Sequence, residues 1–128
     1  ADKRVSIAHK IVERAEALDI PREDIIIDCL NMPAAADSKA SLIIIEAIRR
    51  IKAELGVNMT LGGSNVSFGL PDRNLINGVF LAIALEAGVT CPVVDVAKIR
   101  PAVLAIDALL DRDMYMRRFI QDYRERNK

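Results

Sequence analysis

Thr60 to Arg73 reads TLGGSNVSFGLPDR, and this stretch decides how the rest of the chain is interpreted. It begins at the end of an apolar segment, Val57 to Leu61, and turns abruptly to glycine and small polar residues. It ends at Pro71-Asp72, where a helical pattern starts. A strand, a polar glycine-rich loop and a helix in this order often form part of a binding site, because glycine lets a ligand approach the main chain. Such turns are common, so the neighbouring segments must show the same design.

The composition of the chain excludes several classes of protein. It has 128 residues, and its 18 basic and 18 acidic residues leave no net charge. A nucleic-acid or membrane-surface binder would carry a basic excess, so neither class is expected. The two cysteines, Cys29 and Cys91, form no disulfide or zinc pattern, as is typical of a reducing compartment. With no apolar signal core and no long apolar run, we expect a cytoplasmic protein.

Apolar periodicity divides the chain into alternating helices and strands. The predicted order is a helix over 5–18, a strand over 24–30, a helix from about 40 to 55, a strand over 57–61, a helix over 72–87, a strand over 89–96, a helix over 101–110 and a last helix from 113. Parallel strands need such crossover helices. The sequence therefore predicts an α/β fold with three strand–helix units and an extra terminal helix.

Two apolar patterns predict which side chains are buried. The run Ile25 to Ile27 predicts a strand that is buried on both faces, as in parallel sheets. The helix over 40–55 is expected to bury Ile44, Ile45, Ile48, Ile51 and Leu55, and the helix over 72–87 is expected to bury Leu75, Ile76, Val79, Phe80 and Ile83.

Polar residues follow the predicted strands at the point where each strand ends. They are Asp28, Ser64, Asn65 and Asp95. In parallel α/β sheets this carboxyl-terminal edge carries the functional groups. For Asp28 the residues alone leave two readings open, a hydrogen bond within its own loop or contact with a ligand. The single histidine, His9, is interpreted as a surface residue, because no second histidine completes a metal site.

Three segments, DIIIDCL (24–30), LGVNMTLGGSNVSFGLPDR (55–73) and LLDRDMYMRRFI (109–120), resemble a known family. They are similar to the pterin-binding domain of methyltetrahydrofolate:corrinoid methyltransferases, which also occurs in cobalamin-dependent methionine synthase. Dihydropteroate synthase belongs to the wider group. The resemblance implies a TIM barrel with the pterin at its carboxyl-terminal mouth. It also implies transfer of the N5-methyl group of methyltetrahydrofolate to a Co(I) corrinoid carried by a partner protein or domain.

The resemblance also implies roles for particular residues. Asp28 matches the aspartate that binds the pterin ring, and Asn65 matches the catalytic asparagine that hydrogen-bonds near N5. Ser64, Ser67 and Arg73 match the surrounding substrate-binding residues. No metal ligand is implied, and the corrinoid is expected on the partner. Cys29 departs from the pattern, because relatives usually have proline after the aspartate.

The length of the chain covers only part of the implied fold. A TIM barrel takes about 250 residues, and the resemblance covers its last three strand–helix units. We therefore expect residues 1–128 to be the C-terminal half of a pterin-binding barrel, either with a missing N-terminal half or as a homo-oligomer of two copies. The alternatives are a non-catalytic pterin- or partner-binding half-barrel module and a dihydropteroate synthase-like enzyme. The SNVS segment at 64–67 favours methyl transfer over the latter.

Overall fold

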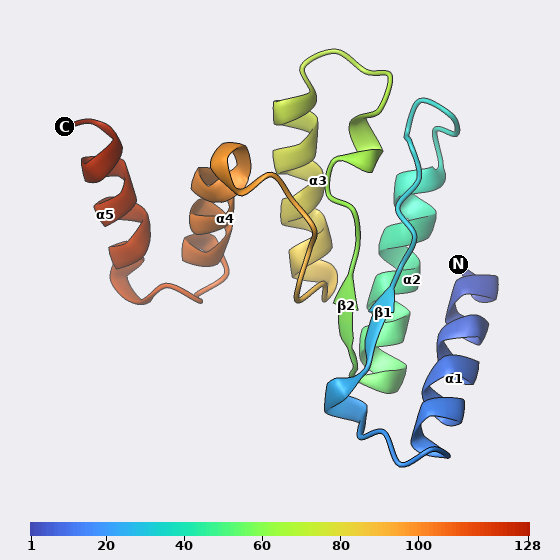
Figure 1. Cartoon of the computed structure of the whole chain (residues 1–128). Coiled ribbons are helices and arrows are strands. Elements are labelled where there is room, and N and C mark those ends of the chain that lie inside the picture. The colour runs from blue at the N-terminus through green and yellow to red at the C-terminus, as the bar shows by residue number, and fades with distance from the viewer.

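The computed structural model describes residues 1–128 as helices layered against a short parallel sheet (Figure 1). The helices are α1 (Asp2–Glu16), α2 (Ala40–Leu55), α3 (Arg73–Ala87), α4 (Val96–Leu109) and α5 (Arg117–Arg126), and the strands are β1 (Ile26–Asp28) and β2 (Asn58–Thr60). Short 3-10 turns lie at Arg22–Asp24, Asn65–Ser67 and Met114–Met116. No helix is long and apolar enough to cross a membrane.

The sheet pairs β1 with β2 in parallel, with Ile26 opposite Asn58 and Asp28 opposite Thr60. Helices α2 and α3 lie behind the strands in Figure 1, and the other face of the sheet carries no helix. The apolar side chains on the covered face, Ile27 and Met59, are buried. The opposite face holds Ile26, which is 56% exposed, and Asp28. We call this the open face of the sheet.

The prediction that the isoleucine strand is buried on both faces was therefore wrong. Ile25 and Ile27 are buried, whereas Ile26 lies on the open face. Three consecutive isoleucines suit a strand that is packed on both faces and also a strand with one uncovered face. The run alone does not show which of the two this chain has.

The predicted third strand over 89–96 was wrong as a regular strand. The segment runs beside β2, since the main-chain N–H groups of Thr90 and Val93 donate to Met59 and Leu61, and Val93 forms an isolated parallel bridge with Gly62. Pro92 lies within this segment, and a proline is uncommon inside a regular strand because it has no N–H to donate. The coarse α/β class is confirmed, with one pair of regular strands in place of three strands.

The helices carry most of the core. All five side chains predicted for the inner face of α2 are buried, and α1 buries Val5, Ala8 and Val12. For α3 the predicted face was partly wrong: Leu75, Val79 and Ile83 are exposed, and the helix buries Phe80, Leu81, Ala84, Leu85 and Ala87. The helix predicted from Pro101 begins at Val96, so that proline lies inside α4.

Candidate active site at the ends of the strands

Asp28 ends β1 on the open face. Its Oδ1 accepts a hydrogen bond from the main-chain N–H of Leu30 at 2.8 Å. Leu30 adopts a left-handed conformation with φ of 52°, which the aspartate turn supports. The other carboxylate oxygen, Oδ2, has no hydrogen-bond partner in the chain, and the residue is exposed. The two readings of Asp28 are thus compatible, because one oxygen closes the turn and the other is available to a ligand.

Cys29 follows Asp28 and points into the core. The residue is 2% exposed, and burial together with the neighbouring Asp28 carboxylate raises the pKa of its thiol to about 11. A thiol with this pKa is protonated at neutral pH and is a poor nucleophile. Cys29 therefore contributes packing to the site, where the related pattern has proline.

Asn31 joins the loop after β1 to the loop after β2. Its Nδ2 donates to the main-chain oxygen of Gly62 at 2.9 Å, and its own main-chain oxygen accepts from Asn65 Nδ2 at 3.4 Å. The N–H of Ala34 also donates to the oxygen of Val66 at 2.9 Å. Two loops that are about thirty residues apart in the sequence are therefore held together at one end of the sheet.

The side chain of Asn65 lies against Gly62. A Cβ on Gly62 would come within 2.8 Å of Asn65 Nδ2, so only glycine leaves room for this position. A main-chain oxygen can only accept, so the atom of Asn65 that faces Asn31 must be the NH₂ group. The Oδ1 of Asn65 has no partner in the chain, and the residue is exposed. The structure thus presents this amide oxygen as a hydrogen-bond acceptor.

The same loop is held by hydrogen bonds among three other predicted residues, Ser64, Ser67 and Arg73. Arg73, in the first turn of α3, donates from Nε to Ser67 Oγ at 3.0 Å and from its NH₂ group to the Ser64 oxygen at 3.1 Å. Ser67 Oγ also donates to the Ser64 oxygen at 3.1 Å. Ser67 is fully buried, so any effect on a ligand acts through the shape of the loop.

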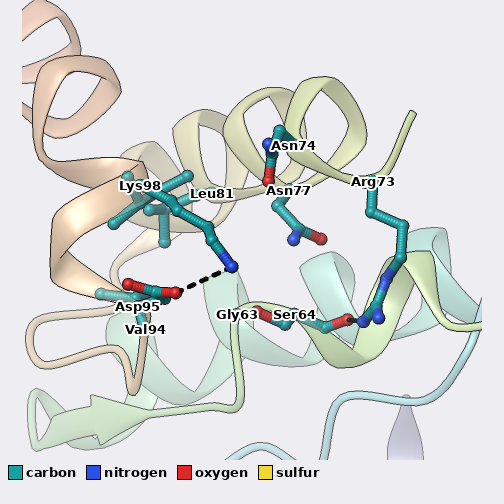
Figure 2. A pocket seen from close by; sticks show the side chains of 10 residues that line it. Gly63, Ser64, Arg73, Asn74, Asn77, Leu81, Val94, Asp95 and Lys98 are labelled. Atoms are coloured by element: carbon teal, nitrogen blue, oxygen red, sulfur yellow. Dashed lines mark hydrogen bonds and ion pairs between the residues drawn. The ribbon is translucent and has the colours of Figure 1, made fainter.

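A cavity of about 310 Å³ lies between this loop and the first turns of α3 and α4 (Figure 2). Ser64 and Arg73 line it, together with Asn77, whose buried Oδ1 has no partner. Lys98, in the first turn of α4, also lines the cavity and pairs with Asp95 at 3.1 Å. This contact with Lys98 holds the pKa of the Asp95 carboxyl below its ordinary value. Asp28 and Asn65 do not line this cavity, so the predicted residues do not all share one pocket.

Asn31 and Lys98 were missed by the sequence interpretation. Asn31 lies three residues after Asp28, and a polar residue so close to the end of a strand was a usable signal. Lys98 gave no such signal, because it lies inside a segment whose strand and helix boundaries were misplaced.

Comparisons with known proteins agree on one family. Residues 1–95 match the family described as pterin binding enzymes. The methylcorrinoid:tetrahydrofolate methyltransferase of Eubacterium limosum is 31% identical, over 97% of this chain and 47% of that relative. The methionine synthase of Mycobacterium leprae is 34% identical over 78% of this chain, and that of Mycobacterium tuberculosis is 36% identical over 79%.

The extent of these matches differs between this chain and its relatives. The chain spans about half of the Eubacterium protein, and the match covers 9% of each methionine synthase. The family match covers most of the chain and includes β1, β2 and both loops that Asn31 joins. The chain belongs to the pterin-binding enzyme family.

Proposed function

We propose that this chain is the C-terminal part of a pterin-binding barrel. In this proposal it binds methyltetrahydrofolate and helps to transfer its N5-methyl group to a corrinoid on a partner protein or domain. One relative is named a methylcorrinoid:tetrahydrofolate methyltransferase, which supports a folate and a corrinoid as the two substrates. The observation that carries the proposal is the amide of Asn65, whose NH₂ group is turned toward Asn31 and whose free oxygen lies at the same end of the sheet as Asp28.

Asp28 would hold the pterin ring. The amino-pyrimidinone edge of a pterin offers adjacent N–H donors, and a carboxylate accepts such a pair with charge-assisted hydrogen bonds. Oδ2 is free, and Oδ1 keeps lone-pair capacity after accepting from Leu30. The exposure of Asp28 on the open face allows a planar ring to approach it.

Asn65 would act at N5. A tertiary amine is a poor leaving group until it is protonated, and a protonated N5 becomes a hydrogen-bond donor. The free Oδ1 of Asn65 is an acceptor whose partner appears as N5 gains its proton. An interaction that strengthens in this way lowers the barrier more than it increases substrate affinity.

The corrinoid would supply the nucleophile, its Co(I) centre, which receives the methyl group. This chain offers no cluster of histidine, cysteine and carboxylate side chains suited to hold a metal. Its one histidine, His9, pairs with Glu54 at 2.7 Å between α1 and α2. In this proposal the partner holds the corrinoid and presents it to the pterin over the open face.

The alternative is a module that binds a pterin or a partner without turnover. It is favoured by exposed apolar side chains, since Ile26 on the open face is 56% exposed, and Leu30 and Phe68 in the loops that follow the strands are 61% and 66% exposed. Such surface is suited to further strands or to a partner. The dihydropteroate synthase-like reading has no comparable support, because both named kinds of relative are methyl-transfer proteins.

The experiment compares Asn65→Ala with wild type in the protein at its natural length. Methyl transfer to a reduced corrinoid protein in single turnover is expected to fall about 10²-fold, as when one preorganised hydrogen-bonding group is lost. Affinity for methyltetrahydrofolate, measured by calorimetry, is expected to fall less, because Asp28 still holds the ring.

The matched control is Asn127→Ala, which removes an amide that donates to the Tyr123 oxygen at 2.7 Å at the end of α5. Rate and affinity should both match wild type. Wild-type protein that binds methyltetrahydrofolate but never transfers the methyl group would support the non-catalytic module. An Asn65→Ala protein with normal rate and affinity would contradict the proposed role of Asn65.

A further inference from the structure

Asn31 is buried at a cost that packing alone does not explain. The residue is 4% exposed, and its Oδ1 has no hydrogen-bond partner. A buried polar atom without a partner destabilises a fold, and an apolar side chain of similar size avoids that penalty. We therefore look for the role of asparagine at this position in its Nδ2 group, which is the part of the side chain that makes a hydrogen bond.

We propose that Asn31 is a positioning residue that fixes the orientation of the Asn65 amide. This inference rests on the proposed function for its consequence in methyl transfer. Three contacts connect Asn31, Gly62 and Asn65 in a ring. Asn31 Nδ2 donates to the Gly62 oxygen at 2.9 Å, and Gly62 packs against the side chain of Asn65. Asn65 Nδ2 in turn donates to the main-chain oxygen of Asn31 at 3.4 Å.

The last of these contacts is long and weak, so it depends on where the Asn31 main chain lies. The shorter bond from Asn31 Nδ2 to Gly62 holds that main chain beside the second loop. From the other side, Arg4 of α1 donates from Nε to the Cys29 oxygen at 3.3 Å and from its NH₂ group to the Leu30 oxygen at 3.4 Å. These contacts hold the main chain at Asn31 in place, and the main-chain oxygen of Asn31 then sets the orientation of the Asn65 amide.

Direct contact between Asn31 and a ligand does not fit the structure. Its Oδ1 has almost no accessible surface, and the whole residue is 4% exposed. Any effect of Asn31 must pass through Asn65, which is exposed. The contact between the NH₂ group of Asn65 and the Asn31 oxygen favours the orientation in which the Oδ1 of Asn65 faces the site. Loss of Asn31 would let the amide rotate and would mix donor and acceptor orientations.

The test uses Asn31→Leu, because leucine removes the bond to Gly62 and also removes the unpaired oxygen. The primary measurement is the side-chain NH₂ resonance of Asn65 by ¹⁵N NMR, without any ligand. In wild type we expect one preferred amide orientation and slower hydrogen exchange than in the variant. In Asn31→Leu we expect motional averaging and exchange faster by about tenfold or more, with an unchanged or raised melting temperature.

The matched control is Asn58→Leu at the opposite end of β2. Asn58 Nδ2 also donates to a main-chain oxygen, that of Glu23, at 3.2 Å. This variant should leave the Asn65 resonance as in wild type. If Asn31→Leu does not fold, Asn31→Asp keeps the size of the side chain and turns the donor toward Gly62 into an acceptor, so it should release the Asn65 amide in the same way.

The functional arm measures single-turnover methyl transfer and affinity for methyltetrahydrofolate in the natural-length protein. For Asn31→Leu we expect the rate at saturation to fall about tenfold and the affinity to change less than about threefold. An Asn65 resonance that is identical in wild type and in the Asn31 variants would overturn the inference. If the resonance changes but wild type does not bind methyltetrahydrofolate, the positioning role stands and the proposed function fails.

Discussion

Arg73 and Ser67 are joined by a hydrogen bond of 3.0 Å from the guanidinium Nε to a hydroxyl that is fully buried. The same guanidinium donates to the Ser64 oxygen at 3.1 Å. Two donors in a fixed fork thus hold the loop that follows β2 against the first turn of α3. These hydrogen bonds therefore stabilise the conformation of the loop that carries Asn65.

Arg73→Lys should therefore loosen the loop. An ammonium group on a flexible stem cannot reproduce the planar fork, so one of the two hydrogen bonds is lost. We expect the free energy of unfolding in urea to fall by about 1–2 kcal/mol, with part of the loss due to the buried Ser67 hydroxyl. The control is Arg49→Lys, whose exposed pair with Glu86 at 3.0 Å should change stability by less than about 0.5 kcal/mol. Equal effects of the two variants would show that Arg73 is an ordinary surface residue.

Gly62→Ala should displace the side chain of Asn65. The new Cβ would lie 2.8 Å from Asn65 Nδ2, closer than such atoms approach, so the exposed side chain has to move. We expect the Asn65 side-chain resonance to shift and methyl transfer at saturation to fall by about tenfold or more.

The matched control for this substitution is Gly78→Ala in α3. A Cβ at Gly78 would meet Ala102 Cβ at 3.7 Å, an ordinary contact. Alanine in a helix interior should raise stability by up to about 1 kcal/mol. If Gly62→Ala leaves both the resonance and the rate unchanged, the close approach of Gly62 and Asn65 has no functional meaning.

The sequence predicted the elements more reliably than their burial. Five apolar side chains at helical spacing placed α2 correctly, because that helix is covered by both its neighbours and the sheet. The same kind of pattern failed for α3, where apolar residues on both sides of the helix leave the buried face ambiguous. Pro92 could have warned against a regular third strand, since a proline removes a donor from the ladder.

Asp113 makes the stability of the C-terminal helix depend on pH. Burial raises the pKa of its carboxyl, but hydrogen bonds from the N–H groups of Arg118 and Phe119, both at 3.1 Å, and the charge of Arg118 outweigh this and hold the pKa below its ordinary value. A carboxyl with a lowered pKa stabilises the fold above its unfolded value of 3.8, and that contribution disappears as the pH falls through the folded value.

Asp113→Asn should remove this dependence. Between about pH 5 and about pH 2.5, wild type should lose more unfolding free energy than the variant, because only wild type takes up a proton at this position on unfolding. Urea denaturation at each pH gives the comparison, and the other acidic groups cancel between the two proteins. Parallel stability curves for the two proteins would rule out this role for Asp113.

The sequence predicted individual candidate residues, but it did not predict how their side chains and loops are arranged. Asp28 and Asn65 were proposed because they follow strands and match a family pattern, and their roles stay predictions. That the two loops are tied together by Asn31 depends on a hydrogen bond across 31 positions, which no local pattern records. Ser67 was predicted to lie beside the ligand, whereas in the structure its buried hydroxyl accepts a hydrogen bond from Arg73. The sequence does not separate these cases, because a serine hydroxyl in a turn can bond to a ligand or within the protein.

The open face predicts association of the 128-residue chain. β1 has a partner strand on one side only, and Ile26 on its open face is 56% exposed. Exposed apolar surface at an unpaired strand edge favours pairing with another chain. Light scattering after size exclusion should show a mass that rises with concentration, and Ile26→Thr should reduce it. The control is Leu42→Thr on α2, where leucine is 72% exposed and away from the sheet edge. A concentration-independent monomer with cooperative unfolding would contradict this prediction.

Calorimetric titration of methyltetrahydrofolate into wild type and Asp28→Asn, in the protein at its natural length, tests the proposed pterin site most directly. Asparagine retains an oxygen for the Leu30 N–H, so the melting temperature should be unchanged. It loses the charge-assisted pair with the pterin, so binding should weaken by about 1.5–3 kcal/mol. Asp37→Asn is the matched control, since Asp37 closes the same kind of turn with the N–H of Lys39 at 2.9 Å, and it should bind as wild type does. Equal affinity for Asp28→Asn and wild type would contradict a pterin site at Asp28.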